Sequence, residues 1–600
     1  MNYGRLQPKS ISQPEFTHDQ YESGSSEPPK KPRSKLKLLL IVGITLIVAS
    51  AVSVALVVAL RNKASGGGSG SMVRPKPTKA ISRVCSRTLY QNLCVNSFLD
   101  FPGSLTASVK DLVHISVNMS LQRVGSALYT STDINNVEMD LRVRSAYNDC
   151  VELLEDSVEQ LSRSLTTVAP SSSGDTQRVG STDDVMTWLS ASLTNQDTCT
   201  DGLSEAEDGE VKRLMQEKLK DLSELVSNSL AIYSSESDDD DVDETPIENR
   251  RRRLMSEASG KRSSEFPEWV SKKERRLLQM PAAVIQADIV VSKDGNGTCK
   301  TIKEAIKKAP QHSSRRFIIY VKAGRYEERD LKVGRKKTNL MIIGDGKGKT
   351  VITGGVSVAD HVTTFHTASF AATGAGFMAR DITFENYAGP AKHQAVALRV
   401  GADHSVVYRC QVIGYQDTLY VHSQRQFYRD CDIYGTVDFI FGNAAVVLQN
   451  CNIYARKPMD QQKITITAQN RKDPNQNTGI SIHSCKLLAQ PDLLNGSFQT
   501  FLGRPWKMYS RTVYMLSYMG QHIDPKGWLE WDGTFALDTL YYGEYMNYGP
   551  GGAIGQRVKW PGYRVITSEI EASRFTVGKF IYGSSWLPAT GVAFVAGLSA

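Results

Sequence analysis

Four short segments that begin with cysteine recur through the C-terminal half of the chain. They start at Cys410, Cys431, Cys451 and Cys485, at intervals of 21, 20 and 34 residues, and apolar or aromatic residues follow each cysteine. Short strand-like segments at such regular spacing favour a parallel coil in which each turn stacks on the previous one. The longer interval then predicts a turn that carries an insertion.

A pair of aspartates follows the first two copies at the same interval. Asp417 and Asp438 are 21 residues apart, so stacking of adjacent turns would bring the two carboxyl groups side by side. Neighbouring carboxyl groups disfavour each other's ionisation, which allows one to act as an acid and the other as a nucleophile. A single aspartate after a strand is most often a turn former, but the pair makes an enzyme our leading hypothesis.

The residues around this pair suit ester chemistry on a sugar. Apolar residues follow Asp438, and Gln416 and Gln394 are primary amides that can hold a developing oxyanion without adding charge. Arg504 can pair with one carboxylate in bidentate fashion. Trp506 offers a flat face for a sugar ring, although ordinary core packing is an equal alternative.

Other chemistries find no support in the sequence. The ten histidines show no HxH or HExxH arrangement, and no Gly-x-Ser-x-Gly motif is present, so we expect no metal, no cofactor and no serine nucleophile. The net charge of +8 is small for 600 residues, and no basic run interleaved with aromatic residues predicts a nucleic-acid surface. A mild positive balance does suit an anionic polysaccharide.

The N-terminal region predicts export. Residues 38–60 are 23 residues without a charge and follow five Lys or Arg between positions 30 and 37, which predicts a transmembrane signal anchor with a cytosolic N-terminus. Residues 1–37 then form a disordered cytosolic tail, and residues 61–78 a flexible linker. A cleaved signal peptide is the alternative. Nine cysteines agree with the secretory pathway, as do glycosylation sequons at Asn118, Asn296 and Asn495.

The region 79–233 has apolar residues at three- and four-residue spacing, which is typical of helices. Its four cysteines are Cys85, Cys94, Cys150 and Cys199, which allow three pairings, and proximity favours Cys85 with Cys94. A charged linker follows at 234–278, with basic clusters that include Arg253 and Arg276. Such a stretch is either a solvated linker or, in an exported protein, a target for proteolytic processing.

Five motifs in the strand-rich region 279–600 resemble, in order, the signature blocks of plant pectin methylesterases. They are Gly324-Arg-Tyr-Glu-Glu328, Gln394-Ala-Val-Ala-Leu398, Gly414-Tyr-Gln-Asp-Thr-Leu419, Asp438-Phe-Ile-Phe-Gly442 and Leu502-Gly-Arg-Pro-Trp506. The resemblance implies an all-β, right-handed parallel β-helix. It also implies an enzyme of the cell wall that demethylates homogalacturonan, which releases methanol and leaves pectate.

The same resemblance implies roles for individual residues. Asp438 would attack the ester carbonyl, while Asp417 would first protonate the leaving methanol and then act as base toward water. Gln416 and Gln394 would stabilise the oxyanion, and Arg504 would orient Asp438. The substrate-contacting positions of the family correspond to Thr364, Gln394, Arg504 and Trp506.

Residues 79–233 resemble the pectinesterase-inhibitor domain, on the motifs Cys85-Ser-Arg-Thr-Leu-Tyr-Gln-Asn-Leu-Cys94, Ala146-Tyr-Asn-Asp-Cys150 and Trp188-Leu-Ser-Ala-Ser-Leu193. Gln91 stands where that family commonly has proline. The resemblance implies an all-α four-helix bundle with disulfides Cys85–Cys94 and Cys150–Cys199. In the strand-rich region it implies a bridge Cys431–Cys451, with Cys410 and Cys485 in the same column.

The resemblance also implies how such a chain is matured. The basic linker matches the place where proenzymes of this kind are cut, so a subtilisin-like processing protease is an expected partner, together with separate pectinesterase-inhibitor proteins. A helical region ahead of a cleavable linker predicts that a membrane-anchored precursor stays silent or retained until processing. Two alternative functions remain. One is a lyase-like pectate-binding β-helix, which would need calcium-binding carboxylates and a basic catalytic residue. The other is a non-catalytic inhibitor or scaffold.

Overall fold

The computed structural model describes residues 75–169, 180–240, 286–494 and 498–598. The predicted tail, the signal anchor and most of both linkers lie outside these residues, as do Arg253, Arg276 and Asn495. None of the helices in the described ranges combines the length and the apolar character that a membrane span needs. Of the other two sequons, Asn296 is exposed in a turn, and Asn118 is partly buried on a long helix.

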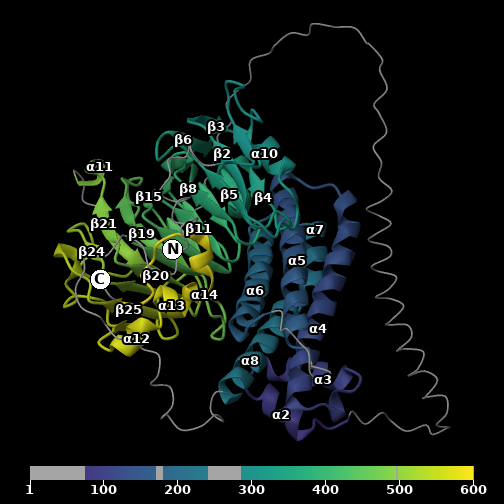
Figure 1. Ribbon diagram of the computed structural model, residues 1–600. Helices are drawn as coiled ribbons and strands as arrows, with labels where there is room; N and C mark the ends of the chain where they lie inside the picture. Colours follow the sequence, from purple (N-terminus) through teal and green to yellow (C-terminus); the bar gives the residue numbers. More distant parts are fainter. Residues whose placement is uncertain (1–74, 170–179, 241–285, 495–497, 599–600) are drawn as a thin grey trace, which may run out of the picture. The chain divides into compact units, whose positions relative to one another are not determined.

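The strand-rich domain is a coil of short strands that stack into three parallel sheets (Figure 1). In stacking order, the first sheet contains β1 (Ile289–Val291), β2 (Phe317–Val321), β5 (Leu340–Ile343), β8 (Met378–Arg380), β11 (Ser405–Tyr408), β14 (Arg425–Arg429), β17 (Ala445–Gln449), β20 (Gly479–His483), β23 (Arg511–Met515), β25 (Tyr541–Tyr545) and β26 (Tyr563–Val565). The second contains β4 (Lys332–Val333), β7 (Phe370–Ala372), β10 (Leu398–Val400), β13 (Leu419–Val421), β16 (Ile440–Gly442), β19 (Ile464–Gln469) and β22 (Thr500–Gly503). The third contains β3 (Gly324–Glu327), β6 (Thr350–Gly354), β9 (Thr383–Asn386), β12 (Gln411–Ile413), β15 (Asp432–Gly435), β18 (Asn452–Ala455), β21 (Lys486–Ala489) and β24 (Tyr518–Met519). The predicted parallel coil is confirmed.

The cysteine repeat marks the same corner of successive turns. Each cysteine comes directly before a strand of the third sheet, and the strands that follow pair in register, one turn to the next. The residue ahead of each cysteine is left-handed, with φ between 51° and 55° at Arg409, Asp430, Asn450 and Ser484. A single left-handed residue bends the backbone sharply. Each turn of the coil therefore passes here from the first sheet into the third.

The expected bridge between Cys431 and Cys451 is absent, which corrects the sequence-based prediction. All four cysteines of the column are buried free thiols. The Cys431 thiol lies 3.3 Å from the carbonyl oxygens of both Val407 and Arg429. Its S–H group therefore has backbone hydrogen-bond acceptors. Because the four cysteines occupy equivalent positions in the stack, strand spacing alone does not select one pair for oxidation.

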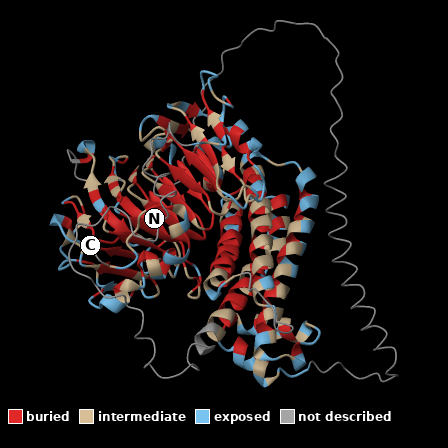
Figure 2. Cartoon of the chain, in the orientation of Figure 1, coloured by how far each residue is buried: buried red, intermediate tan, exposed pale blue. Residues whose placement is uncertain are grey.

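Apolar side chains fill the coil and also cover the outside of its first sheet. Inside the coil, Phe370 packs against Phe377 and Phe384 with ring centroids 5.8 and 5.2 Å apart. Outside, three short C-terminal helices lie on the first sheet through residues such as Phe580 and Trp586: α12 (Glu569–Ser573), α13 (Val577–Phe580) and α14 (Gly583–Trp586). Figure 2 shows most of the strands as buried. The short helices α10 (Ile302–Lys308) and α11 (Pro491–Leu494) lie between strands in sequence.

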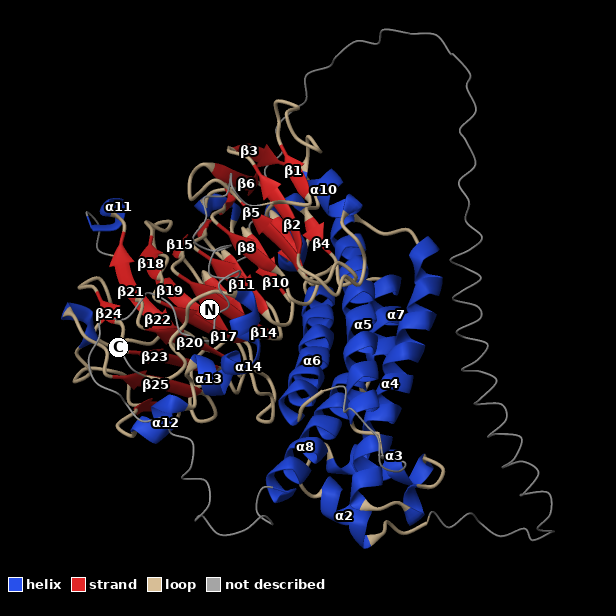
Figure 3. Cartoon of the chain, in the orientation of Figure 1, coloured by secondary structure: helices blue, strands red, loops and turns tan. Residues whose placement is uncertain are grey.

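The N-terminal domain is helical, as predicted, but its described residues contain more helices than four (Figure 3). The helices are α2 (Lys79–Cys85), α3 (Gln91–Asp100), α4 (Val109–Ser131), α5 (Leu141–Thr167), α6 (Thr182–Ser204), α7 (Glu210–Leu219) and α8 (Leu222–Asp240). Ser108 and Ser181 begin α4 and α6 with capping boxes, in which the serine and an aspartate three residues later satisfy each other's backbone N–H. The predicted disulfides Cys85–Cys94 and Cys150–Cys199 are both present.

Candidate active site

Asp417 and Asp438 occupy the same position in adjacent turns of the coil. Each lies two residues before a strand of the second sheet, and those strands, β13 and β16, pair with Leu419 opposite Ile440. The backbone N–H of Asp417 donates to the carbonyl of Val437 at 3.0 Å. Both aspartates are left-handed, with φ of 60° and 51°. The same conformation occurs at the cysteine corners, so here too it belongs to the bends between the sheets of the coil.

Asp438 is a buried carboxylate that two other turns of the coil hold in place. Arg504 Nε donates to Asp438 Oδ1 at 2.9 Å, and Arg504 Nη2 donates to Oδ2 at 2.6 Å, so the pair is bidentate. The Thr465 hydroxyl donates to Oδ1 at 2.6 Å and accepts the backbone N–H of Asp438 at 2.9 Å. A guanidinium in this geometry stabilises the carboxylate charge and fixes the direction in which its oxygens point.

Asp417 lies beside this ion pair in a different electrostatic environment. Burial, above all, raises the pKa of Asp417 well above its usual range, and the nearby charge of Asp438 adds to the effect. The positive charge of Arg504 opposes the rise, while Glu205 of the helical domain reinforces it. The two carboxyl groups are therefore unequal, because Asp417 retains its proton under conditions in which an ordinary aspartate has lost it.

The other predicted site residues lie on this and neighbouring turns of the coil. Gln416 is buried directly ahead of Asp417, and Gln394 lies one turn away, where the Ala395 N–H donates to the Gln416 carbonyl at 3.2 Å. Thr364 begins the short 3-10 helix η5 (Thr364–Thr367), in front of β7 in the sequence. Both amides lie on adjacent turns of the coil that lead into the second sheet.

An aromatic surface extends from the carboxyl groups along the second sheet. The Trp506 ring lies 6.0 Å from the Phe441 ring, which stacks on Tyr420 at 4.2 Å. Sequence reasoning missed Phe441, Tyr420 and the supporting hydroxyl of Thr465. The two rings occupy neighbouring positions in β16 and β13, so the register of the repeat was the signal that would have found them. Flat rings next to carboxyl groups suit the apolar faces of sugar residues.

Comparison with known proteins accounts for both domains. The profile of the family described as Pectinesterase matches residues 288–584, and that of Plant invertase/pectin methylesterase inhibitor matches residues 79–232. An Arabidopsis thaliana protein named "Probable pectinesterase/pectinesterase inhibitor 61" is 62% identical, with 100% of each chain covered. The chain belongs to the pectinesterase family. A second Arabidopsis thaliana protein, "Probable pectinesterase/pectinesterase inhibitor 34", is 67% identical over 87% of this chain and 86% of its own.

A solved structure, "Pectin methylesterase from Carrot", matches the strand-rich domain alone. It is 57% identical with a TM-score of 0.52, and the match covers 52% of this chain and 99% of the carrot chain. Nearly the whole carrot chain is therefore matched by about half of this chain. In the described residues of this pectinesterase, no group of three His, Cys, Asp or Glu is arranged to hold a metal ion.

The helical domain of this pectinesterase packs on the second sheet, over the carboxyl groups. Leu153, Cys199 and Met215 of the helices share one apolar cluster with Phe365 and Tyr420 of the coil. Polar contacts continue the interface, because the Thr198 hydroxyl lies 3.0 Å from His422 Nε2 and Asn443 Nδ2 donates to the Thr194 hydroxyl at 2.9 Å. Helix α6 thus contacts the C-terminal ends of β13 and β16, while Asp417 and Asp438 precede the N-terminal ends of the same strands.

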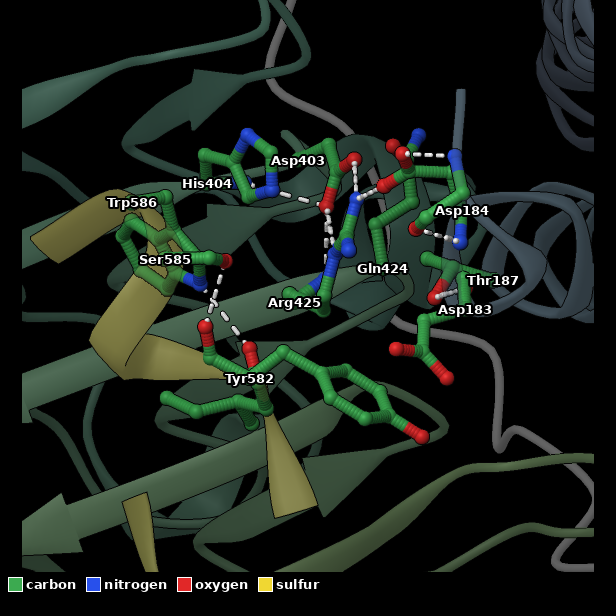
Figure 4. Close-up of polar contacts among 12 residues, drawn as sticks. Asp183, Asp184, Thr187, Asp403, His404, Gln424, Arg425, Tyr582, Ser585 and Trp586 are labelled. Atoms are coloured by element: carbon green, nitrogen blue, oxygen red, sulfur yellow. Dashed lines mark hydrogen bonds and ion pairs between the residues drawn. The ribbon is translucent and has the colours of Figure 1, made fainter. Parts of the chain in front are cut away.

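A buried arginine fixes the start of α6 to the coil (Figure 4). Arg425 Nη2 lies 2.6 Å from Asp184 Oδ1 of α6 and 2.6 Å from Asp403 Oδ2 of the coil. Burial alone would raise the pKa of Asp403, but the Arg425 charge holds it well below its usual range. His404 stacks on Trp586 at 4.9 Å beside this group. The helical domain therefore supplies one of the two carboxylates that neutralise a buried cation of the catalytic domain.

Proposed function

We propose that this pectinesterase hydrolyses the methyl esters of homogalacturonan, with Asp438 as the nucleophile of an acyl-enzyme mechanism. The observation that carries the proposal is the bidentate pair between Arg504 and Asp438 beside a second carboxyl group whose pKa is raised. An ionised, oriented carboxylate next to a protonated one supplies both a nucleophile and an acid.

The first half of the reaction forms the acyl-enzyme. Asp438 attacks the carbonyl carbon of the methyl ester, and its carboxylate becomes one side of an anhydride. Negative charge develops on the former carbonyl oxygen, where the Gln416 and Gln394 amides donate hydrogen bonds. As the bond to the methoxy oxygen breaks, Asp417 transfers its proton to that oxygen, and methanol leaves.

The second half of the reaction returns the enzyme to its starting state. Asp417, now ionised, takes a proton from a water molecule that attacks the anhydride. Cleavage of the anhydride releases a galacturonic acid residue, which then loses its proton to solvent, and restores the carboxylate of Asp438 to its pair with Arg504. Trp506 and Thr364 bind the sugar residues on either side during both steps. Atoms and charge balance, since one ester and one water give one carboxylic acid and one methanol.

Methanol release tests this function directly. Residues 279–600, which correspond to the whole carrot enzyme, should release methanol from highly methylated pectin without producing unsaturated chain ends. Unsaturated ends in the absence of methanol would instead support the lyase-like alternative, in which the galacturonan chain is cut by elimination.

We also propose that the helical domain inhibits the catalytic domain of the same chain. Support comes from helix α6, which packs over β13 and β16, and from Glu205, whose charge acts on Asp417. A substrate chain and α6 need the same surface, so the uncut chain has no room for pectin. The full chain should therefore release methanol far more slowly than residues 279–600, and equal rates would refute inhibition.

The same proposal includes the membrane anchor, the proteolytic cut and the architecture of the two domains. A signal anchor at 38–60 would hold the precursor in the secretory membrane, and a subtilisin-like protease would cut near Arg253 or Arg276 to release the enzyme to the cell wall. The long helices α4, α5, α6 and α8 would form the four-helix bundle of the inhibitor family, and the coil would be right-handed. Expression in plant cells with Arg253 and Arg276 replaced by alanine should leave the uncut chain retained inside the cell.

A further inference from the structure

Helix α6 presents a short row of two carboxylates to the catalytic domain. Asp197 and Asp201 are four residues apart, so they lie on one face of the helix about 6 Å apart. Glu205, four residues further on at the C-cap of the helix, instead pairs with Arg142 of α5. Residues of α6 share an apolar cluster with Tyr420 and Phe441, so this part of the helix lies against the aromatic surface of the second sheet.

Two lysines of the catalytic domain pair with this row. Lys472 Nζ lies 2.8 Å from Asp197 Oδ1, and Lys507 Nζ lies 2.9 Å from Asp201 Oδ1. Lys472 follows β19 and Lys507 follows β22, and these two strands are neighbours in the second sheet. Lys507 also lies over the Trp506 ring, 5.8 Å from its centre. Both ammonium groups thus belong to the same surface as the aromatic rings.

Desolvation offsets part of the attraction within these pairs. Asp197 is buried, and burial is the first cause that raises its pKa, so the docked state loses much of the attraction to desolvation. The Lys472 side chain is still 46% exposed beside it. The apolar cluster next to these pairs shows that the interface uses hydrophobic contacts elsewhere. Both lysines become free to bind another carboxylate when the helical domain is gone.

We propose that Lys472 and Lys507 bind the free carboxylates of galacturonate residues that are already de-esterified, and that the α6 carboxylates occupy those positions in the uncut chain. The inference rests on the function proposed above. A methyl ester is neutral, whereas its hydrolysis product is an anion, so an ammonium group distinguishes the two. The mature enzyme then binds beside its own product, which favours removal of neighbouring esters in succession.

Calorimetry with unesterified tetragalacturonate tests the lysines without any need for catalysis. Residues 279–600 should bind this oligosaccharide, and Lys472→Gln and Lys507→Gln should each weaken the affinity about tenfold. Lys486→Gln is the matched control, because Lys486 is exposed on β21 of the third sheet, away from the second. If both variants bind tetragalacturonate as tightly as the control variant, the proposal is overturned.

A second experiment, on the whole protein, tests whether the α6 carboxylates and the oligosaccharide occupy the same positions. A site for a sequence-specific protease is placed in the 234–278 linker and cut, so that both domains remain together in solution. Tetragalacturonate should then displace the helical domain in the parent protein, and Lys507→Gln should weaken the binding of the helical domain as well as that of the oligosaccharide. If tetragalacturonate and the helical domain bind the catalytic domain at the same time, they do not share positions, and this part of the proposal is refuted.

Steady-state kinetics separate this inference from the proposed esterase function. The ratio of KM for partly de-esterified pectin to KM for fully esterified pectin should rise in both lysine variants. A parent enzyme that binds tetragalacturonate through the lysines but releases no methanol would refute only the esterase function.

Discussion

The hydroxyl of Thr465 offers a sharp test of how Asp438 is held. It donates to Asp438 Oδ1 at 2.6 Å and accepts the backbone N–H of the same residue at 2.9 Å, and Thr465 is fully buried. Thr465→Val keeps the shape of the side chain and removes both hydrogen bonds. The nucleophile then keeps its pair with Arg504 but loses the contact that fixes the other side of Oδ1.

Two separate effects are expected from this substitution. A hydrogen bond to a charged group contributes about 1.5–3 kcal/mol, so loss of the contact should lower kcat about 10- to 100-fold, with a smaller change in KM. The orphaned backbone N–H should also lower the free energy of unfolding by about 1–3 kcal/mol. Methanol release by residues 279–600 measures the first effect, and urea denaturation measures the second.

Thr467→Val provides the matched control. Thr467 lies two residues further along β19, on the same face and equally buried, but its hydroxyl donates to the Leu502 carbonyl at 2.9 Å. Its loss should lower stability by about 1 kcal/mol and leave kcat close to that of the parent. If the two valine variants lose the same kcat, the loss reflects general loosening of the strand, and a positioning role for Thr465 is refuted.

Three further predictions concern the ion pair and the domain interface. Arg504→Lys keeps the charge but not the bidentate geometry, so kcat of residues 279–600 should fall about 10- to 100-fold, and an unchanged kcat would contradict the orienting role. In the linker-cut protein, Asp184→Asn should weaken binding of the helical domain at least about tenfold, because Arg425 is buried, whereas Asp208→Asn, at an exposed position, should not. Asp156, which lies 3.4 Å from Arg335 of the coil, should make binding of the domains tighten as pH falls from 7.5 to 5, because burial raises its pKa to about 7 and the docked state takes up a proton. Burial lowers the pKa of His422 beside Thr198 to about 3, which acts in the opposite direction, so the contribution of Asp156 is measured as the difference between the parent and Asp156→Asn by calorimetry on the cut protein. If Asp156→Asn has the same pH profile as the parent, the Asp156 carboxyl group is equally solvated in the separated domains.

The coil and its carboxyl pair were predictable because both follow from periodicity. A repeat of about 21 residues with apolar positions after each cysteine is satisfied by stacked parallel strands, and equal spacing then stacks Asp417 on Asp438. Arg504 was accessible to the same reasoning, since a bidentate partner is the usual way to hold a buried carboxylate. Thr465 could not be predicted in this way, because threonine is common in strands. Only the register of the strands shows that its hydroxyl contacts Asp438.

The details that depend on contacts between distant segments were not predictable. The repeat that placed four cysteines in one column could not select a bridge, and the expected Cys431–Cys451 pair is instead two free thiols. Helix periodicity identified a helical domain but did not count its shorter helices. The pairing of Lys472 with Asp197 joins residues 275 positions apart, and no local pattern encodes such a distance.

The role of Asp438 is tested most directly by Asp438→Asn in residues 279–600, assayed for methanol release with the fold checked by circular dichroism. Asparagine retains the shape of the side chain and removes the nucleophilic carboxylate. The mechanism predicts that kcat falls by at least about four orders of magnitude while the fold is kept. Methanol release within tenfold of the parent rate would contradict Asp438 as the nucleophile.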